Sequence, residues 1–162
     1  MTSDNAPGAM DREHVAKPLV SVVIPTRNRP EYLAEALRAL CAGEMQAFEA
    51  WIMDQSDDDA TRDVVEAIGD PRLCHYRMPR LGACPARNLG AALASASVVA
   101  FLDDDCSPNH DWLVRIVAAF DADAALQFIF GQLKAPPNDR TSGSYPEFLP
   151  SRSLLMGGSR RD

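Results

Sequence analysis

Three consecutive carboxylates, Asp103, Asp104 and Asp105, follow directly on the apolar run at residues 98–102. Like charges so close together repel each other, and the end of a buried strand solvates them poorly. In an extended segment the side chains of residues i and i+2 point the same way, so Asp103 and Asp105 could share one hard cation. Without nearby His or Cys ligand pairs, Mg²⁺ or Mn²⁺ is favoured over Zn²⁺. The competing interpretation is a solvated acidic turn at the start of the next helix.

A second acidic stretch, DQSDDDAT, occupies residues 54–61. Its later acids fit a polar turn in which Asp59 caps the following helix. Asp54 and Gln55 differ, because they stand at the predicted strand end itself. There a carboxylate and an amide could accept and donate hydrogen bonds at the edge of a nucleobase.

A third polar stretch, RLGACPARN at residues 80–88, combines Gly82, a predicted helix start and Arg87. Helix N-termini favour phosphate, and Arg binds phosphate with a fork of donors. Arg87 could equally form a structural salt bridge with one of the many acids. Because no GxGxxG follows the first predicted strand and no GxxxxGK[ST] occurs, neither a dinucleotide fold nor a P-loop is supported.

These polar stretches need a scaffold, and the sequence predicts an alternating one. Strands are expected at residues 19–25, 48–54, 72–78, 98–102 and 125–133, and helices at 29–42, 60–69, 84–96 and 111–122. Such alternation predicts an α/β fold with a mostly parallel sheet and helices on both faces. Ligands of such sheets bind beyond the carboxyl ends of the strands, where the strand order reverses. Three of these strands are followed by polar sequences, which are TRN, DQSDDD and DDDCSP. The polar strand ends are therefore expected to point towards one crevice.

The composition excludes several classes of protein. The chain has 162 residues, of which 46% are hydrophobic, which is enough for one core. A net charge of -7 argues against a nonspecific nucleic-acid binder. Four cysteines without a CxxC pair suit a reducing compartment, so a cytoplasmic location is expected. No apolar run approaches the ~20 residues that span a bilayer, so membrane association is possible but not indicated.

Three parts are expected along the chain: a flexible tail at residues 1–17, an α/β domain at 18–131 and an irregular tail at 132–162. The last part holds four of the twelve prolines and no periodic segment. A structureless stretch of this length is uncommon in a compact domain. It is interpreted either as a functional loop region or as the start of an incomplete region, and the second interpretation is favoured.

Taken together, VSVVIPTRNRPEYLAEAL, DQSDDDAT, GACPARNLGAA and VAFLDDDC resemble the family 2 glycosyltransferases with the GT-A fold, across residues 18–131. The resemblance implies a Rossmann-like GT-A sheet that ends before the acceptor-binding half. It also implies a nucleotide-diphospho-sugar donor, expected to be a UDP-sugar, and a divalent cation, Mg²⁺ or Mn²⁺. The implied reaction is an inverting transfer to the hydroxyl group of a saccharide, lipid or other acceptor.

The resemblance also assigns residues to the donor. Pro25 and Thr26 would line the nucleoside pocket after the first strand. Asp54 and Gln55 would occupy the turn that recognises the nucleobase. Many relatives have a second acid where Gln55 stands, so the identity of the base stays open.

The remaining assignments concern the sugar diphosphate. Gly82 and Arg87 fall in the segment that closes over the nucleotide. Asp103 and Asp105 match the DxD motif and would hold the metal, with Asp105 in direct contact and Asp104 nearer the ribose. In family members the catalytic base lies well after this motif, so it is expected beyond the end of this chain.

Three interpretations compete. The first is a metal-dependent inverting glycosyltransferase, and the second is a nucleotide-sugar-binding module without catalytic activity. The third is a nucleotidyltransferase-like enzyme, which is disfavoured because no Gly-rich phosphate loop with a following Lys succeeds the first strand. On its own, the chain is expected to bind the donor and to transfer little.

Overall fold

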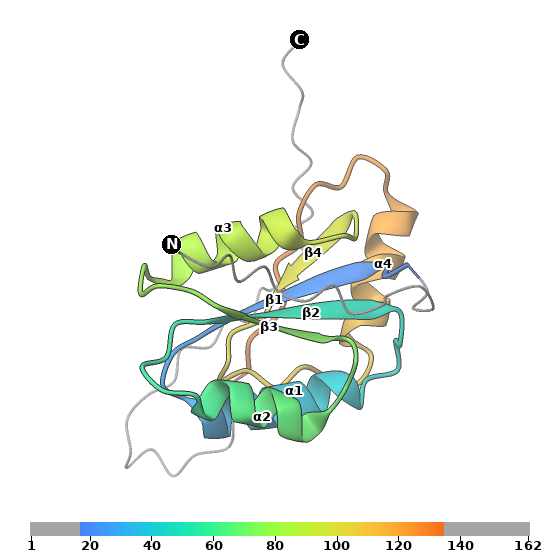
Figure 1. The fold of residues 1–162 in the computed structure, drawn as a ribbon. Helices are drawn as coiled ribbons and strands as arrows, with labels where there is room; N and C mark the ends of the chain where they lie inside the picture. The colour runs from blue at the N-terminus through green and yellow to red at the C-terminus, as the bar shows by residue number, and fades with distance from the viewer. Residues whose placement is uncertain (1–16, 135–162) are drawn as a thin grey trace. The chain divides into compact units, whose positions relative to one another are not determined.

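The computed structural model describes residues 17–134, drawn as a ribbon in Figure 1. Strands and helices alternate as β1 (Val20–Thr26), α1 (Pro30–Cys41), β2 (Phe48–Asp54), α2 (Ala60–Ile68), β3 (Leu73–Arg77), α3 (Ala83–Leu93), β4 (Val98–Phe101) and α4 (Trp112–Ala122). The predicted alternation is confirmed for these eight elements. The predicted tails lie outside the described residues, apart from residue 17 and residues 132–134.

The four strands form one parallel sheet in the order β3-β2-β1-β4. β1 pairs with β2 from Val20 opposite Phe48 to Thr26 opposite Asp54. The other side of β1 pairs with β4. Because β2 and β3 lie on one side of β1 and β4 on the other, the strand order reverses between β1 and β4. Parallel sheets bind their ligands at such a point.

Helices cover both faces of this sheet (Figure 1). α3 packs on β1 and β2, while α1 and α2 pack against each other on the opposite face. The apolar side of α1 carries the fully or nearly fully buried Leu33, Leu37 and Leu40 at helical spacing. β1 is covered on both faces, which explains why its sequence is a continuous apolar run instead of an alternating one.

The contact between α3 and the sheet depends on Gly90. A Cβ atom at this position would clash with Cγ1 of Val23 and would lie 3.2 Å from Cγ of Met53. Val23 and Met53 are both fully buried, so neither side chain has free space into which it could move. A residue without a side chain therefore lets α3 approach β1 and β2 closely.

Residues from 115 onwards belong to a second compact unit, whose described part ends at residue 134. The predicted strand at 125–133 is wrong, because only isolated bridge residues form there, at Phe128 and Leu133. Within this segment the rings of Phe128 and Phe130 meet edge to face at 5.7 Å. Aromatic and β-branched residues favour strands, but a strand also needs a continuous partner for its backbone hydrogen bonds.

No helix between residues 17 and 134 is both long and apolar enough to cross a bilayer.

Candidate functional site

The acidic turn, defined as residues 103–105, lies where the carboxyl ends of β1 and β4 meet. The N–H of Leu102 donates to the carbonyl oxygen of Val23 at 3.1 Å, which continues the pairing beyond β4. Asp104 is buried, and its Oδ2 accepts a hydrogen bond from Oγ1 of Thr26 at 2.8 Å. Burial raises the pKa of Asp104, although the hydrogen bond from Thr26 and the charge of Arg29 oppose the shift. Two predicted site residues that are 78 positions apart in the sequence are thus in direct contact.

The two outer carboxylates of the acidic turn are exposed and pair with different arginines. Asp103 pairs with Arg87 of α3. Asp105 Oδ2 lies 3.2 Å from Nη1 of Arg29, and the same nitrogen lies 3.3 Å from Oδ1 of Asp104. The turn is therefore held in place by cations from both sides.

The donor chemistry of the acidic turn fits a hard cation. Mg²⁺ is usually bound through one or two carboxylates, with phosphates of the substrate and water completing its shell. Asp103 and Asp105 supply two exposed carboxylates, with side chains 54% and 50% exposed. Residues 17–134 contain no group of three or more His, Cys, Asp or Glu side chains that could enclose a metal by themselves. The metal assignment thus stays a prediction that requires phosphate ligands.

An open pocket of about 320 Å³ lies beside the acidic turn. Its lining residues are Pro25, Thr26, Arg27, Arg29, Gln55 and Asp104. The volume is within the range of small-molecule sites, and the lining combines two cations with buried acceptors. Four predicted residues line this pocket, and five do not belong to the lining: Asp54, Gly82, Arg87, Asp103 and Asp105.

Gln55 joins the end of β2 to the loop before α3. Its Oε1 accepts hydrogen bonds from the N–H groups of Leu81 and Gly82, at 2.7 and 2.8 Å. Its Nε2 donates to the carbonyl oxygen of Gly82 at 3.3 Å. Gly82 has a φ of 94°, which a residue with a side chain adopts only under strain. Gln55 therefore sets the position of the predicted nucleotide-closing segment.

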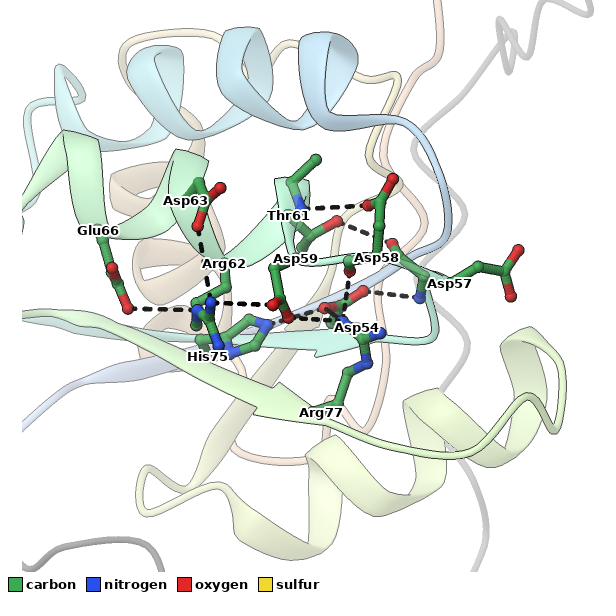
Figure 2. Close-up of polar contacts among 12 residues, drawn as sticks. Asp54, Asp57, Asp58, Asp59, Thr61, Arg62, Asp63, Glu66, His75 and Arg77 are labelled. Atoms are coloured by element: carbon green, nitrogen blue, oxygen red, sulfur yellow. Dashed lines mark hydrogen bonds and ion pairs between the residues drawn. The ribbon is translucent and has the colours of Figure 1, made fainter.

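Asp54 is fully buried at the end of β2, and its carboxylate is bonded within the domain (Figure 2). Oδ1 accepts from the N–H of Ser56 at 2.8 Å, and Oδ2 accepts from Nη1 of Arg77 at 3.1 Å. The Nε2 of His75 lies 2.9 Å from the same Oδ2. Burial alone would raise the pKa of Asp54, but the bonds from Ser56 and His75 and the charge of Arg77 lower it. Asp54 thus connects β2 to β3, and its assignment to base recognition stays a prediction.

Two arginines of the pocket, Arg27 and Arg29, were not among the predicted site residues. Nη2 of Arg27 pairs with Oδ2 of Asp57 at 3.2 Å. Asn28, in the left-handed region with a φ of 54°, donates to the same oxygen at 2.7 Å. The Nε of Arg27 is buried and has no hydrogen-bond partner among the described residues. The polar sequence TRN after the first strand indicated a polar strand end. It did not indicate which side chains near this end would line the pocket.

The family model described as "Glycosyl transferase family 2" matches residues 21–158, which is more than half of the chain. A validoxylamine A glucosyltransferase of Streptomyces hygroscopicus subsp. jinggangensis is 37% identical over 130 residues, covering 77% of this chain and 30% of the relative. Glycosyltransferase AglE of Haloferax volcanii is 31% identical over 151 residues, covering 90% of this chain and 49% of the relative. The chain thus spans less than half the length of these curated relatives.

Solved structures show the same fold. The mannosyltransferase PcManGT from Pyrobaculum calidifontis, in complex with GDP-Man and Mn²⁺, superposes with a TM-score of 0.60 at 25% identity. This match covers 68% of this chain and 34% of that one. S. aureus TarS 1-349 in complex with UDP-GlcNAc superposes with a TM-score of 0.58 at 26% identity, covering 64% and 31%.

Proposed function

This chain belongs to glycosyl transferase family 2, and from that premise we propose that it forms the donor-binding part of an enzyme that moves a sugar from a nucleotide diphosphate to an acceptor hydroxyl. Its described residues form the parallel sheet and covering helices of a GT-A fold. The donor is proposed to be a UDP-sugar, the cation Mg²⁺ or Mn²⁺, and the stereochemical course inverting.

One observation carries the proposal. Asp104 is buried where the strand order reverses, bonded to Thr26 of β1, and both residues line the open pocket of about 320 Å³. Burying a carboxylate is costly unless polar partners satisfy it, so an acid held there at the mouth of a pocket suits ligand binding.

The nucleoside is proposed to lie against Pro25 and Thr26, in the pocket beside Gln55. Gln55 lines the pocket and accepts a hydrogen bond from the N–H of Gly82, while Asp54 accepts one from the N–H of Ser56 in the turn after β2. Relatives of known structure were solved with UDP, with UDP-GlcNAc and with GDP-Man. These ligands support a nucleotide-sugar donor, and UDP is the first nucleotide to test.

The diphosphate is proposed to lie over the acidic turn, with Asp103 and Asp105 as ligands of the divalent cation. When bound, that cation supplies Lewis-acid stabilisation of the charge that grows on the leaving diphosphate. Asp104, which accepts a hydrogen bond from Thr26, is proposed to lie nearer the ribose, and Arg87 pairs with Asp103. An inverting reaction also needs a base for the acceptor hydroxyl, on the opposite face of the sugar.

Calorimetric titration of UDP tests the proposal. UDP is expected to bind the protein in Mn²⁺ and to lose at least tenfold in affinity in EDTA, because removing a charge-assisted interaction costs about 1.4 kcal/mol or more. Asp105→Asn is expected to weaken binding in Mn²⁺ by a similar factor. Asp63→Asn, which neutralises an exposed carboxylate of α2, is the matched control and should bind as the wild type does. Binding indifferent to both metal and Asp105 would reduce the acidic turn to a structural feature.

A further inference from the structure

We infer that Arg29 is the resident counter-cation of the acidic turn, and that it passes from the carboxylates to the donor diphosphate when the divalent cation binds. The inference rests on the proposed function, because it concerns the same pocket and the same ligand. It adds a role for Arg29, and a competition between Arg29 and the divalent cation for the same carboxylates. Neither the sequence motifs nor the comparisons assign these.

The position of Arg29 carries the inference. A single nitrogen, Nη1, lies 3.3 Å from Oδ1 of Asp104 and 3.2 Å from Oδ2 of Asp105. Arg29 also lines the pocket. Its side chain is 53% exposed, so few packing contacts oppose its movement. The single positive charge of Arg29 therefore offsets part of the charge of two adjacent carboxylates, while the exposed side chain remains free to turn towards a ligand.

The other arginines near the pocket are placed differently. Arg87 pairs with Asp103 from α3, and Arg27 is held by Asp57. Within residues 17–134, the ion pairs that reach both Asp104 and Asp105 come from Arg29. Losing Arg29 would consequently leave these two carboxylates to repel each other.

Metal and guanidinium would compete for the same oxygens. A divalent ion bound to Asp105 would lie within a few ångströms of the Arg29 charge, and two cations at that separation repel. Once displaced, the planar guanidinium offers a fork of N–H donors that matches phosphate oxygens. The diphosphate brings its own negative charge, so metal and Arg29 can both remain when the nucleotide is bound.

The test separates metal binding from nucleotide binding. Arg29→Gln removes the competing charge, so Mn²⁺ alone is expected to bind roughly fivefold more tightly. The same variant loses a phosphate contact, so UDP in saturating Mn²⁺ is expected to bind about tenfold more weakly. Uridine, which has no diphosphate, should bind both proteins equally. Arg29→Lys keeps the positive charge but loses the planar fork of donors. Its Mn²⁺ affinity should therefore equal that of the wild type, and its UDP affinity should lie between those of Arg29→Gln and the wild type.

Arg62→Gln is the matched control, because Arg62 pairs with Asp59, Asp63 and Glu66 on the surface of α2 (Figure 2). Weaker Mn²⁺ binding in Arg29→Gln, or a change no larger than in Arg62→Gln, would overturn the inference and leave the proposed function standing. Melting temperatures of all variants check that each is folded. Failure of the wild type to bind UDP or GDP with metal would overturn the proposed function, and the inference with it.

Discussion

Individual charged side chains hold the two ends of the sheet. At the carboxyl end, Asp54 bonds to Ser56, His75 and Arg77. At the amino end, Arg72 lies 2.6 Å from Asp70 and stacks over the Phe48 ring at 4.2 Å. Such partly buried pairs matter because removing one partner leaves the other charge unmatched.

Asp70 gives a prediction on pH. The hydrogen bond from Arg72 holds the pKa of Asp70 at about 2, below its ordinary value of 3.8. Because the folded value is the lower one, this carboxylate stabilises the fold above about pH 4, and its contribution disappears as the pH falls through about 2. Asp70→Asn is therefore expected to lower the free energy of unfolding by about 2 kcal/mol at pH 7.

Urea unfolding of wild type and Asp70→Asn at pH 7, 5 and 3 checks this prediction. The difference between the two proteins should be equal at pH 7 and 5 and smaller at pH 3. Glu66→Gln, an exposed acid of α2, is the control and should stay within about 0.5 kcal/mol of the wild type. A difference that grows on acidification would contradict the assigned direction of the pKa shift.

At the scale of elements, local patterns predicted the core of the domain well. The strand Phe48–Asp54 was predicted with the bounds that the structure has, because its apolar run and its polar flanks are both local signals. The sequence predicts that the polar strand ends point towards one crevice, and the structure brings two of them together through the hydrogen bond between Thr26 and Asp104. The fifth strand failed because strand formation depends on a partner that the segment itself does not contain.

The interactions that were missed are non-local. Arg29 and Asp105 are separated by 76 positions, and Gln55 and Gly82 by 27. Residue type gives Arg29 a charge and Gln55 an amide, but only the fold selects their partners. Gly90 is a further example, since a glycine within a predicted helix shows no sign of the valine that it must avoid.

Gly90→Ala tests the packing of α3. In an exposed helix this change would stabilise by about 1 kcal/mol, because Ala is the better helix former. Here the added methyl group meets Val23, so we expect a loss of about 1–3 kcal/mol in urea unfolding. Asn88→Ala, at an exposed position of the same helix, is the control and should be neutral or slightly stabilising.

Combining Gly90→Ala with Val23→Ala tests the cause. The methyl group of one variant then enters the space left by the other, so the double variant should be more stable than the sum of the two single losses implies. Additive losses would show that the Val23 contact is not what limits the site.

At the scale of the whole molecule, ligand binding is expected to increase the free energy of unfolding. A ligand that binds only the folded chain adds about 2.7 kcal/mol at a hundredfold excess over its Kd. UDP with Mn²⁺ is therefore expected to raise the melting temperature, and EDTA to cancel most of the rise. GDP under the same conditions is the comparison, because the similar solved structures contain UDP in one case and GDP-Man in another. A larger rise with GDP would replace uridine by guanosine as the proposed base.

The hydrogen bonds between the Gln55 side chain and the loop at residues 81–82 affect which substitutions this loop tolerates. Within residues 17–134, its amide bonds to main-chain atoms of Leu81 and Gly82, so these bonds do not depend on the side chain at position 81. That side chain is 60% exposed, whereas position 82 is restricted by its positive φ. The loop can therefore accumulate substitutions at position 81 without changing its course, whereas position 82 has to remain glycine for the same course to be kept.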